Sequence, residues 1–425
     1  MRRYVRLAAF VALLAAFPGV ANANALEFLD RLIQDAENAF KTVQRKPGGP
    51  PPFRVGLMLP KSGQMREAAE RIARGWEIAL QMSDGHVSIR PVDLIVGDTS
   101  DGPDAAVEAA TEMSEVAPID VFAGVLGART AGAMSVYTAE HAKPLVIAGA
   151  IGEHVMTGRC RENVARTSFN IGPYQTTSGR FIAGKIPTLA TLGPASKGGH
   201  RIIRRFVSAY RAAGGHIIEQ FWVPAKRKYD WSAILSRTAL HGPQSVYAFF
   251  EGRNAESIVH QHSRNGIVKT VNLIGPEWLF NPRVMNRRGK HADGLRFLSS
   301  YLPGLDMPGN RIFVDAYRKK YFEDPDSYAY MGYENALAVL LTAADLDGQV
   351  HDGAAFIEAM KKVSYDHLMP RGEFGFNASN SAFLTTLFWV EVVHRDGKTD
   401  MKRLGSIPID PDISTCKQQT AQRTR

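Results

Sequence analysis

The stretch 123–134, with the letters AGVLGARTAGAM, places one arginine between an apolar strand and the start of a helix. The first backbone N–H groups of a helix have no intrahelical partner, and together with the helix dipole they form a seat for an anion. Arg129 adds a planar guanidinium that can hold a carboxylate or sulfonate through two parallel hydrogen bonds. We therefore predict that this turn can bind an organic anion. The alternative is that Arg129 points to solvent or pairs with a nearby acid.

Motifs for catalysis are not found. The stretch 127–134 is not a phosphate-binding loop, because no lysine follows its second glycine, and no G-x-S-x-G turn or H-E-x-x-H helix occurs. His260 and His262 are two residues apart on a predicted helix, so their side chains face different directions and are poorly placed for a shared metal. We expect a protein that is not an enzyme, with no metal and no cofactor.

The N-terminus predicts export. Residues 1–23 combine arginines, a short apolar run and small residues before a cleavage site, the pattern of a secretory signal peptide. No cysteine follows the apolar run, and no later run is long enough to span a membrane. We expect a soluble protein of the periplasm with the signal peptide removed.

Composition points to ordinary globular domains. The chain has 425 residues, 45% of them hydrophobic, and a formal net charge of +9. The sequence lacks a basic stripe interleaved with aromatic residues, so a nucleic-acid partner is not expected. The two cysteines, Cys160 and Cys416, would lie in an oxidising compartment, where they either form one disulfide or remain as two unpaired thiols.

Strands and helices alternate along most of the chain. Residues 26–45 form an amphipathic helix, and the Pro- and Gly-rich segment up to residue 52 is a stiff linker. Short apolar runs typical of buried parallel strands follow at 54–59, 92–98, 120–126, 144–150, 188–194, 216–224, 245–250 and 270–276. Helical patterns separate them, so we predict an α/β fold with parallel sheets in two lobes.

From about residue 53 to residue 416 the chain resembles the type I periplasmic solute-binding proteins of branched-chain amino acid, amide and aromatic-acid ABC transporters, which include the Leu/Ile/Val-binding proteins. The landmarks in the first half are LPKSG, VGDTSDGPDAAVEAATEM and KPLVIAGA. Those in the second half are GPASKGGHRIIRRFVSAYRAAGGHII, FFEGRNAESIVHQHSRNGI, DPDSYAYMGYENALAVL and RGEFGFN. Their order and spacing carry the resemblance.

The resemblance implies two α/β lobes joined by three hinge crossings, which close on a solute and deliver it to an inner-membrane permease. The boundaries that we expect are 53–172 with 300–380 for the N-terminal lobe, 173–299 with 381–416 for the C-terminal lobe, and 417–425 for a flexible tail. The protein is expected to be a monomer. The alternative is an exported regulator or sensor partner of the same fold that binds a protein, and the extra N-terminal helix favours that reading.

The resemblance also assigns the cleft between the lobes. In amino-acid binders of the family, hydroxyl side chains hold the ligand carboxylate at the positions of Ala128 and Ile151, neither of which can do so here. The carboxylate would then rely on Arg129 or on the backbone amides of 128–130 and 149–151. We therefore expect a solute that is bulkier or more apolar than leucine and that carries a carboxylate. The candidate ligand-binding residues are Ala128, Arg129, Thr130, Gly149, Ala150, Ile151, Tyr174, Ser196, Glu251, Glu277 and Trp278, with Tyr229 as a further wall candidate.

Glu277 and Trp278 are the second-lobe candidates with the clearest roles. Glu277 falls where the family keeps a glutamate for the amino group of the ligand, although a surface acid is the alternative. Trp278 could stack on a flat ligand or pack under the hinge. Ala195 and Ser196 stand where relatives often place a tyrosine that covers the ligand.

Overall fold

The computed structural model describes residues 49–157, 161–224, 229–240, 242–243, 245–264, 272–280, 282–365 and 367–410. The chain divides into two units, 1–51 and 52–425. The predicted signal peptide, the helix 26–45, residues 46–48 of the linker, both cysteines and the tail 417–425 lie outside the described residues. Within the described part, no helix combines the length and the apolar character needed to cross a membrane.

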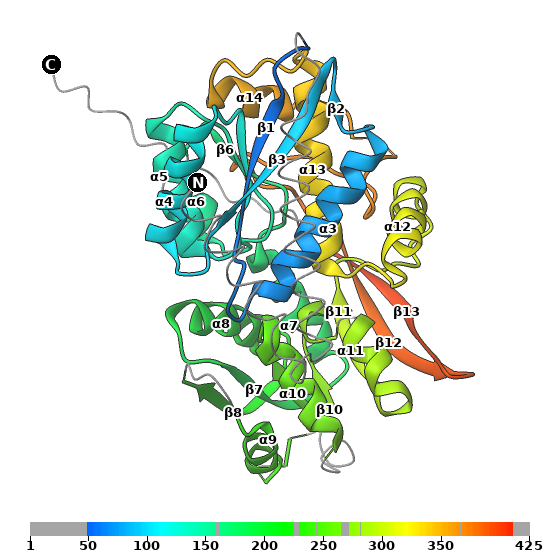
Figure 1. The fold of residues 1–425 in the computed structure, drawn as a ribbon. Coiled ribbons are helices and arrows are strands. Elements are labelled where there is room, and N and C mark those ends of the chain that lie inside the picture. The colour runs from blue at the N-terminus through cyan, green and yellow to red at the C-terminus, as the bar shows by residue number, and fades with distance from the viewer. Residues whose placement is uncertain are drawn as a thin grey trace, which may run out of the picture. The chain divides into compact units, whose positions relative to one another are not determined.

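The first lobe of the second unit is built on a six-stranded sheet with the order β2-β3-β1-β4-β5-β6 (Figure 1). Its strands are β1 (Phe53–Leu59), β2 (His86–Val87), β3 (Arg90–Asp98), β4 (Val121–Gly124), β5 (Leu145–Ile147) and β6 (Val164–Arg166). Neighbouring strands run parallel except β2, which pairs antiparallel with β3. The carboxyl ends of the five parallel strands therefore lie along one edge.

Helices cover both faces of this sheet. They are α3 (Arg66–Met82), α4 (Pro103–Val116), α5 (Ala128–Glu140), α6 (His154–Thr157), α13 (Ser327–Asp345) and α14 (Gly353–Met360). Figure 1 shows α3 and α13 on one face and α4 and α5 on the other. Strand alternation sorts the core accordingly, since Ala123 packs in the cluster that contains Ile72 and Trp76, while Phe122 packs in the cluster that contains Met134.

Helices α3 and α13 cross at very short range. A Cβ atom on Gly75 would lie 2.2 Å from the carbonyl oxygen of Ala329, and one on Gly332 would lie 2.1 Å from the carbonyl oxygen of Ile72. The indole N–H of Trp76 donates to Asn335 Oδ1 at 3.1 Å in the same contact. Glycines are needed here because any side chain would push the two helices apart.

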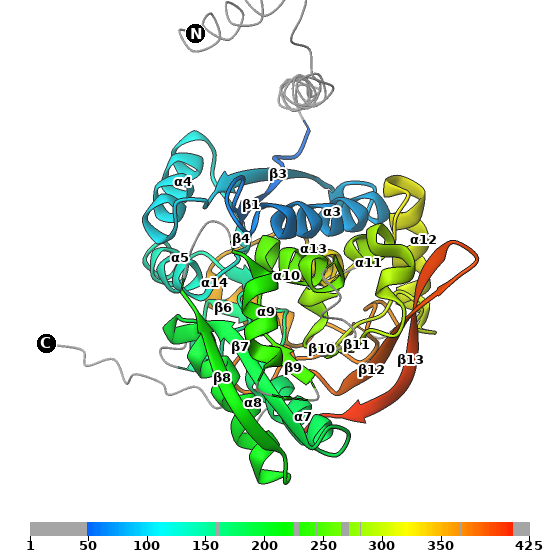
Figure 2. The same ribbon diagram turned by 90° about the horizontal axis from the view of Figure 1, so that it is seen from below.

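The second lobe contains a four-stranded parallel sheet with the order β10-β9-β7-β8. Its strands are β7 (Thr188–Pro194), β8 (His216–Val223), β9 (Ser245–Ala248) and β10 (Asn272–Ile274). The helices are α7 (Ile171–Ala183), α8 (Lys197–Ala212), α9 (Trp231–Ala239), α10 (Gly252–Arg264) and α11 (Pro282–Arg288). Figure 2 shows α7 and α8 on one side of this sheet and α9 and α10 on the other.

An antiparallel sheet of β11 (Arg296–Ser299), β12 (Thr386–Arg395) and β13 (Lys398–Pro408) completes the unit, with α12 (Pro308–Tyr321) between β11 and α13. The chain crosses between the lobes after β6, after β11 and before β12. Arg166 joins two of these crossings, because its backbone N–H donates to Asn380 O at 2.8 Å and its guanidinium donates to Ser381 Oγ at 3.0 Å.

All eight predicted strands are present, most of them with shifted ends. The run 188–194 is β7 without change, whereas the run 120–126 ends as a strand at Gly124. Gly124 and Val125 both have positive φ angles, 85° and 64°, so the backbone turns before the apolar run is over. The predicted lobe boundaries stay a prediction.

Candidate functional site

The lobes touch where the carboxyl ends of their parallel strands meet. Gln64, after β1, donates through Nε2 to the backbone oxygen of Glu251, after β9, at 3.1 Å. The backbone N–H of Arg253 returns a hydrogen bond to Gln64 O at 3.3 Å. Gly252 lies between these contacts at φ +57°, and a Cβ there would lie 2.4 Å from Gln64 O. The carboxyl ends of β1 and β9 therefore face each other across the lobe interface.

A second contact joins the lobes through charge. Glu153, in the loop after β5, pairs with Arg205 of α8, with Oε1 2.9 Å from Nη2. The Arg205 side chain is half exposed at 54%, whereas that of Glu153 is 20% exposed. The carboxylate of Glu153 also lies against Gly172 at the start of α7. The segment after β5 thus contacts both α7 and α8 of the second lobe.

The first predicted anion seat is the start of α5. The helix begins at Ala128, directly after the positive-φ residues Val125 and Gly127. The Thr130 side chain is buried, Ala128 is partly buried and Arg129 is exposed. The free amides of the first turn are therefore present at this edge, while the exposed position of Arg129 fits the solvent-facing alternative better.

Several backbone N–H and C=O groups of the loop after β5 already form hydrogen bonds within the protein. The amide of Gly149 donates to Val125 O at 3.2 Å, so it is not a free donor. The carbonyl oxygen of Ala150 accepts from Arg166 at 3.0 Å, and that of Ile151 accepts from the Ile171 amide at 3.0 Å. The apolar side chain of Ile151 is buried against the core. Of the three amides predicted here, those of Ala150 and Ile151 remain the candidates.

Glu277 is buried, not a surface acid. It follows β10 in a short 3-10 turn, and its side chain accepts hydrogen bonds from the backbone amide and the hydroxyl of Ser300, the latter at 2.6 Å. Ser300 Oγ also lies 2.7 Å from the hydroxyl of Tyr330. Burial raises the pKa of Glu277 to about 7, against the opposing effect of the Ser300 hydrogen bonds. The carboxyl group therefore has partners within the protein.

An aromatic cluster stands beside Glu277. The Trp278 ring centroid lies 5.7 Å from that of Tyr174, 6.3 Å from that of Phe169 and 5.8 Å from that of Phe249. These four rings come from the crossing after β6, the start of α7 and the ends of β9 and β10. The Tyr174 hydroxyl donates to Leu298 O at 2.7 Å, which fixes its orientation. The other three rings are tilted or edge-on to the Trp278 ring, with interplanar angles of 36° for Tyr174, 32° for Phe169 and 70° for Phe249, and all four rings are buried. We call this apolar cluster the aromatic wall.

Ser196 and Tyr229 have local structural partners. Ser196 is the N-cap of α8, and its hydroxyl accepts from the Gly199 amide at 3.0 Å. Tyr229 donates to Pro224 O at 2.5 Å and lines a cavity of about 970 Å³ together with Gln64 and Arg253. The structure therefore brings Tyr174, Glu277 and Trp278 together and leaves Ser196 as an exposed cap.

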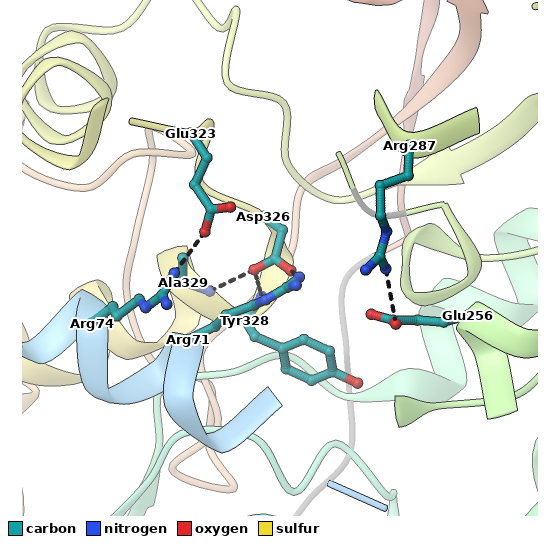
Figure 3. Close-up of polar contacts among 8 residues, drawn as sticks. All are labelled: Arg71, Arg74, Glu256, Arg287, Glu323, Asp326, Tyr328 and Ala329. Carbon is teal, nitrogen blue, oxygen red and sulfur yellow. Dashed lines mark hydrogen bonds and ion pairs between the residues drawn. The ribbon is translucent and has the colours of Figure 1, made fainter. Parts of the chain in front are cut away.

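Sequence reasoning missed two polar residues of the first lobe, Arg71 and Tyr328. Arg71 pairs with Asp326, whose carboxylate also caps α13 by accepting from the amides of Tyr328 and Ala329. Burial alone would lower the pKa of Arg71, but the charge of Asp326 more than offsets this and raises it. Figure 3 shows this group and the Glu256–Arg287 pair of the second lobe, in which the charged atoms are 3.4 Å apart.

The arrangement defines a class. Two α/β lobes, each with a parallel sheet flanked by helices, meet at the carboxyl ends of their strands and are linked by three crossings, as in type I solute-binding proteins. A family model described as periplasmic binding protein matches residues 52–398, and the chain belongs to this family. The family and the fold class read from the sequence are both confirmed, and the family is one of substrate-binding proteins.

Solved structures agree with this assignment. A solute-binding protein of an ABC transporter from R. palustris, solved in complex with benzoate, is 25% identical with a TM-score of 0.78, covering 86% of this chain and 99% of that one. A second from Rhodopseudomonas palustris BisB5, in complex with 3,4-dihydroxy benzoic acid, is 22% identical with a TM-score of 0.77, covering 84% and 97%.

A leucine binding protein from Thermotoga maritima is 19% identical with a TM-score of 0.69, covering 83% of this chain and 98% of that one. A search of curated protein sequences found no match. None of the relatives named above favours the alternative of a regulator that binds a protein.

Proposed function

We propose that this chain is the solute-binding component of an ABC importer and that its solute is a small aromatic carboxylate. The protein acts as a monomer in the periplasm, after removal of residues 1–23, and hands the solute to an inner-membrane permease. The aromatic ring lies against the wall formed by Tyr174, Phe249 and Trp278. The carboxylate lies at the start of α5, on the amides of 128–130 with those of Ala150 and Ile151.

The observation that carries this proposal is the state of Glu277. Its carboxyl group is bonded to the amide and hydroxyl of Ser300, and burial favours its neutral form. With one acceptor site of each oxygen taken by Ser300 and a pKa near 7, this carboxyl group is a weaker partner for the ammonium of an amino acid than a free, fully ionised carboxylate. The wall beside it offers contact area to a flat ring instead.

Two further observations support the same solute class. Ala128 and Ile151 supply no hydroxyl groups, so the anion is held by backbone amides, which suits a simple carboxylate. The benzoate complex of the R. palustris relative shows that a protein with this fold and 25% identity takes such a solute.

The test is calorimetric titration of the purified protein with benzoate and with leucine, isoleucine and valine. We expect benzoate to bind with release of heat and the three amino acids to bind weakly or not at all. Trp278→Phe, which keeps a ring but shortens the wall, should weaken benzoate binding. Submicromolar affinity for any of the three amino acids, with no binding of benzoate, would overturn the proposal.

A further inference from the structure

Helix α8 of the second lobe presents a strongly basic face to solvent. The helix contains no acidic residue, and five cationic side chains are exposed along it: Lys197, Arg201, Arg204, Arg205 and Arg211. The steps from Lys197 to Arg201 and from Arg201 to Arg204 are four and three residues, which places these side chains on one side of an α-helix. The opposite side is apolar and buried in the core, and it consists of Ile203, Phe206, Val207 and Tyr210.

A groove of about 910 Å³ follows this basic face. Its lining includes four of the cations, those at 197, 201, 204 and 205, together with small side chains of α8 at 208, 209 and 212. Glu153 is the one acidic residue of the lining, and it pairs with Arg205 at 2.9 Å. In the part of the chain that the structure describes, no acid forms an ion pair with Lys197, Arg201 or Arg204. The groove therefore carries three positive charges that no acidic side chain neutralises.

The charges of α8 work against the stability of the helix. Cations that are three or four residues apart repel each other, as Lys197 and Arg204 both do with Arg201. Lys197 is also the first residue of α8, where the helix dipole favours an acid, and the first turn contains none. Local sequence choices in natural proteins usually agree with the fold, and departures from this agreement occur mainly at functional sites. The basic face therefore indicates a role other than folding.

The spacing of the cations indicates what kind of anion fits them. Arginine side chains bind phosphate oxygens through two parallel hydrogen bonds, and the start of a helix favours an anion as well. Lys197 and Arg211 are separated by about 21 Å, at about 1.5 Å per helical residue. One small anion cannot contact the whole face, whereas phosphate groups fixed side by side can. Such an array is what an anionic lipid surface presents.

We infer that the basic face of α8 binds the phosphate headgroups of an anionic membrane surface. The inference goes beyond the proposed function, because it concerns a surface of the protein and not its solute. The attraction is electrostatic, so the contact is reversible and weakens as salt is added. The groove lies beside the lobe interface, since Glu153 of the first lobe reaches Arg205 there. A protein bound through α8 therefore holds the interface between its lobes close to the membrane.

The test is co-sedimentation of the purified protein with lipid vesicles. Vesicles of phosphatidylcholine alone are compared with vesicles that also contain about 30% phosphatidylglycerol, at about 50 mM and about 500 mM salt. We expect binding to the anionic vesicles only, and at the lower salt concentration only. Each basic residue near an anionic surface contributes about fivefold, so Arg201→Gln/Arg204→Gln should reduce the partition coefficient by roughly 25-fold. The thermal midpoint of this variant should equal that of the wild type or exceed it, because two like charges are removed.

Arg311→Gln/Lys319→Gln is the matched control. Both residues are exposed on α12, which does not line the groove, and the variant loses the same net charge. It should keep the wild-type partition coefficient within about twofold. Equal losses in the two double variants, binding to phosphatidylcholine vesicles alone, or no binding to either kind of vesicle would overturn the inference. Release of the bound protein by about 10 mM inorganic phosphate, but not by chloride at equal ionic strength, would assign the groove to a free phosphate ion and overturn it as well. The proposed solute is unaffected by any of these outcomes.

Discussion

Arg371 is the residue whose replacement tests the energetics of the hinge region most directly. Its Nε donates to Glu334 of α13 at 2.8 Å, and the two side chains are 3% and 1% exposed. Its terminal nitrogens donate to the carbonyl oxygens of Thr167, at 3.1 Å, and Phe383, at 3.2 Å. One guanidinium therefore connects α13 with two of the three crossings, and Arg371→Met removes all of these bonds with little change in volume.

The loss of unfolding free energy caused by Arg371→Met has an upper limit that depends on pH. Removing one partner of a buried ion pair typically costs about 3–5 kcal/mol, because the other charge is left uncompensated. Glu334 can avoid that state by taking up a proton, and burial already raises its pKa from 4.5 despite Arg371. At about 1.4 kcal/mol per pH unit above 4.5, protonation costs about 4 kcal/mol at about pH 7.5 and about 1.4 kcal/mol at about pH 5.5.

The variant should therefore lose more stability at the higher pH. Without Arg371 the pKa of Glu334 rises further in the folded state only, so the folded variant binds an extra proton and loses stability as pH rises. Urea unfolding of both proteins at the two pH values should give a loss that is larger at the higher one, by up to about 2–3 kcal/mol.

Two further variants sharpen this experiment. In the double variant Arg371→Met/Glu334→Gln the extra pH dependence that Glu334 gives to Arg371→Met should be lost, because the titrating carboxyl group is gone. Arg311→Met removes an ion pair with Asp306 that is exposed at both ends and should cost less than about 1 kcal/mol at either pH. A loss for Arg371→Met that is the same at both pH values would refute the reasoning.

The remaining predictions concern packing and a second buried acid. Gly332→Ala should destabilise the first lobe by about 1–3 kcal/mol or more, because the added methyl group meets the backbone of Ile72. Gly132→Ala in α5 is the control: its new Cβ meets no atom within 4 Å, so it should be neutral or stabilising by up to about 1 kcal/mol. Equal effects of the two variants in chemical unfolding would contradict this prediction. Because the pKa of Glu277 is raised in the folded state, wild-type stability should fall by up to about 3 kcal/mol as pH rises from about 4.5 to about 7. The variant Glu277→Gln should lack this fall. A variant with the same dependence of unfolding free energy on pH as the wild type would show that Glu277 is not its source.

The sequence predicts the layered α/β fold well because its signal is local. Apolar runs such as that of β7 are bounded by glycine and proline, and the amphipathic pattern of α3 marks its buried face at Ile72 and Trp76. Strand β13 was not predicted, since its residues alternate between exposed and partly buried and contain few apolar side chains. The segment forms a strand because it pairs with β12, and this pairing cannot be deduced from the residues of the segment itself.

The site is less predictable for a similar reason. The positions of Glu277 and Trp278 follow from the end of a strand, so the sequence finds them. Arg71 sits in a helix rich in charged residues and reads as solvent-facing, but it is buried because Asp326 lies against it in the fold, 255 residues away. Tyr328 lies in an apolar helical stretch and is predicted as an ordinary core residue. Its neighbours in the sequence do not show that its hydroxyl has no hydrogen-bond partner among the described residues.

The close crossing of α3 and α13 has a consequence for how the chain folds. The two helices that cover one face of the first sheet are separated by more than half of the sequence, so that face stays uncovered during synthesis until residues 327–345 emerge. Until then the apolar side chains of β1, β4 and β5 that point toward this face are exposed to aggregation. A chain truncated before α13 should therefore remain unfolded, and pairing across such a long sequence separation should make completion of the first lobe slow.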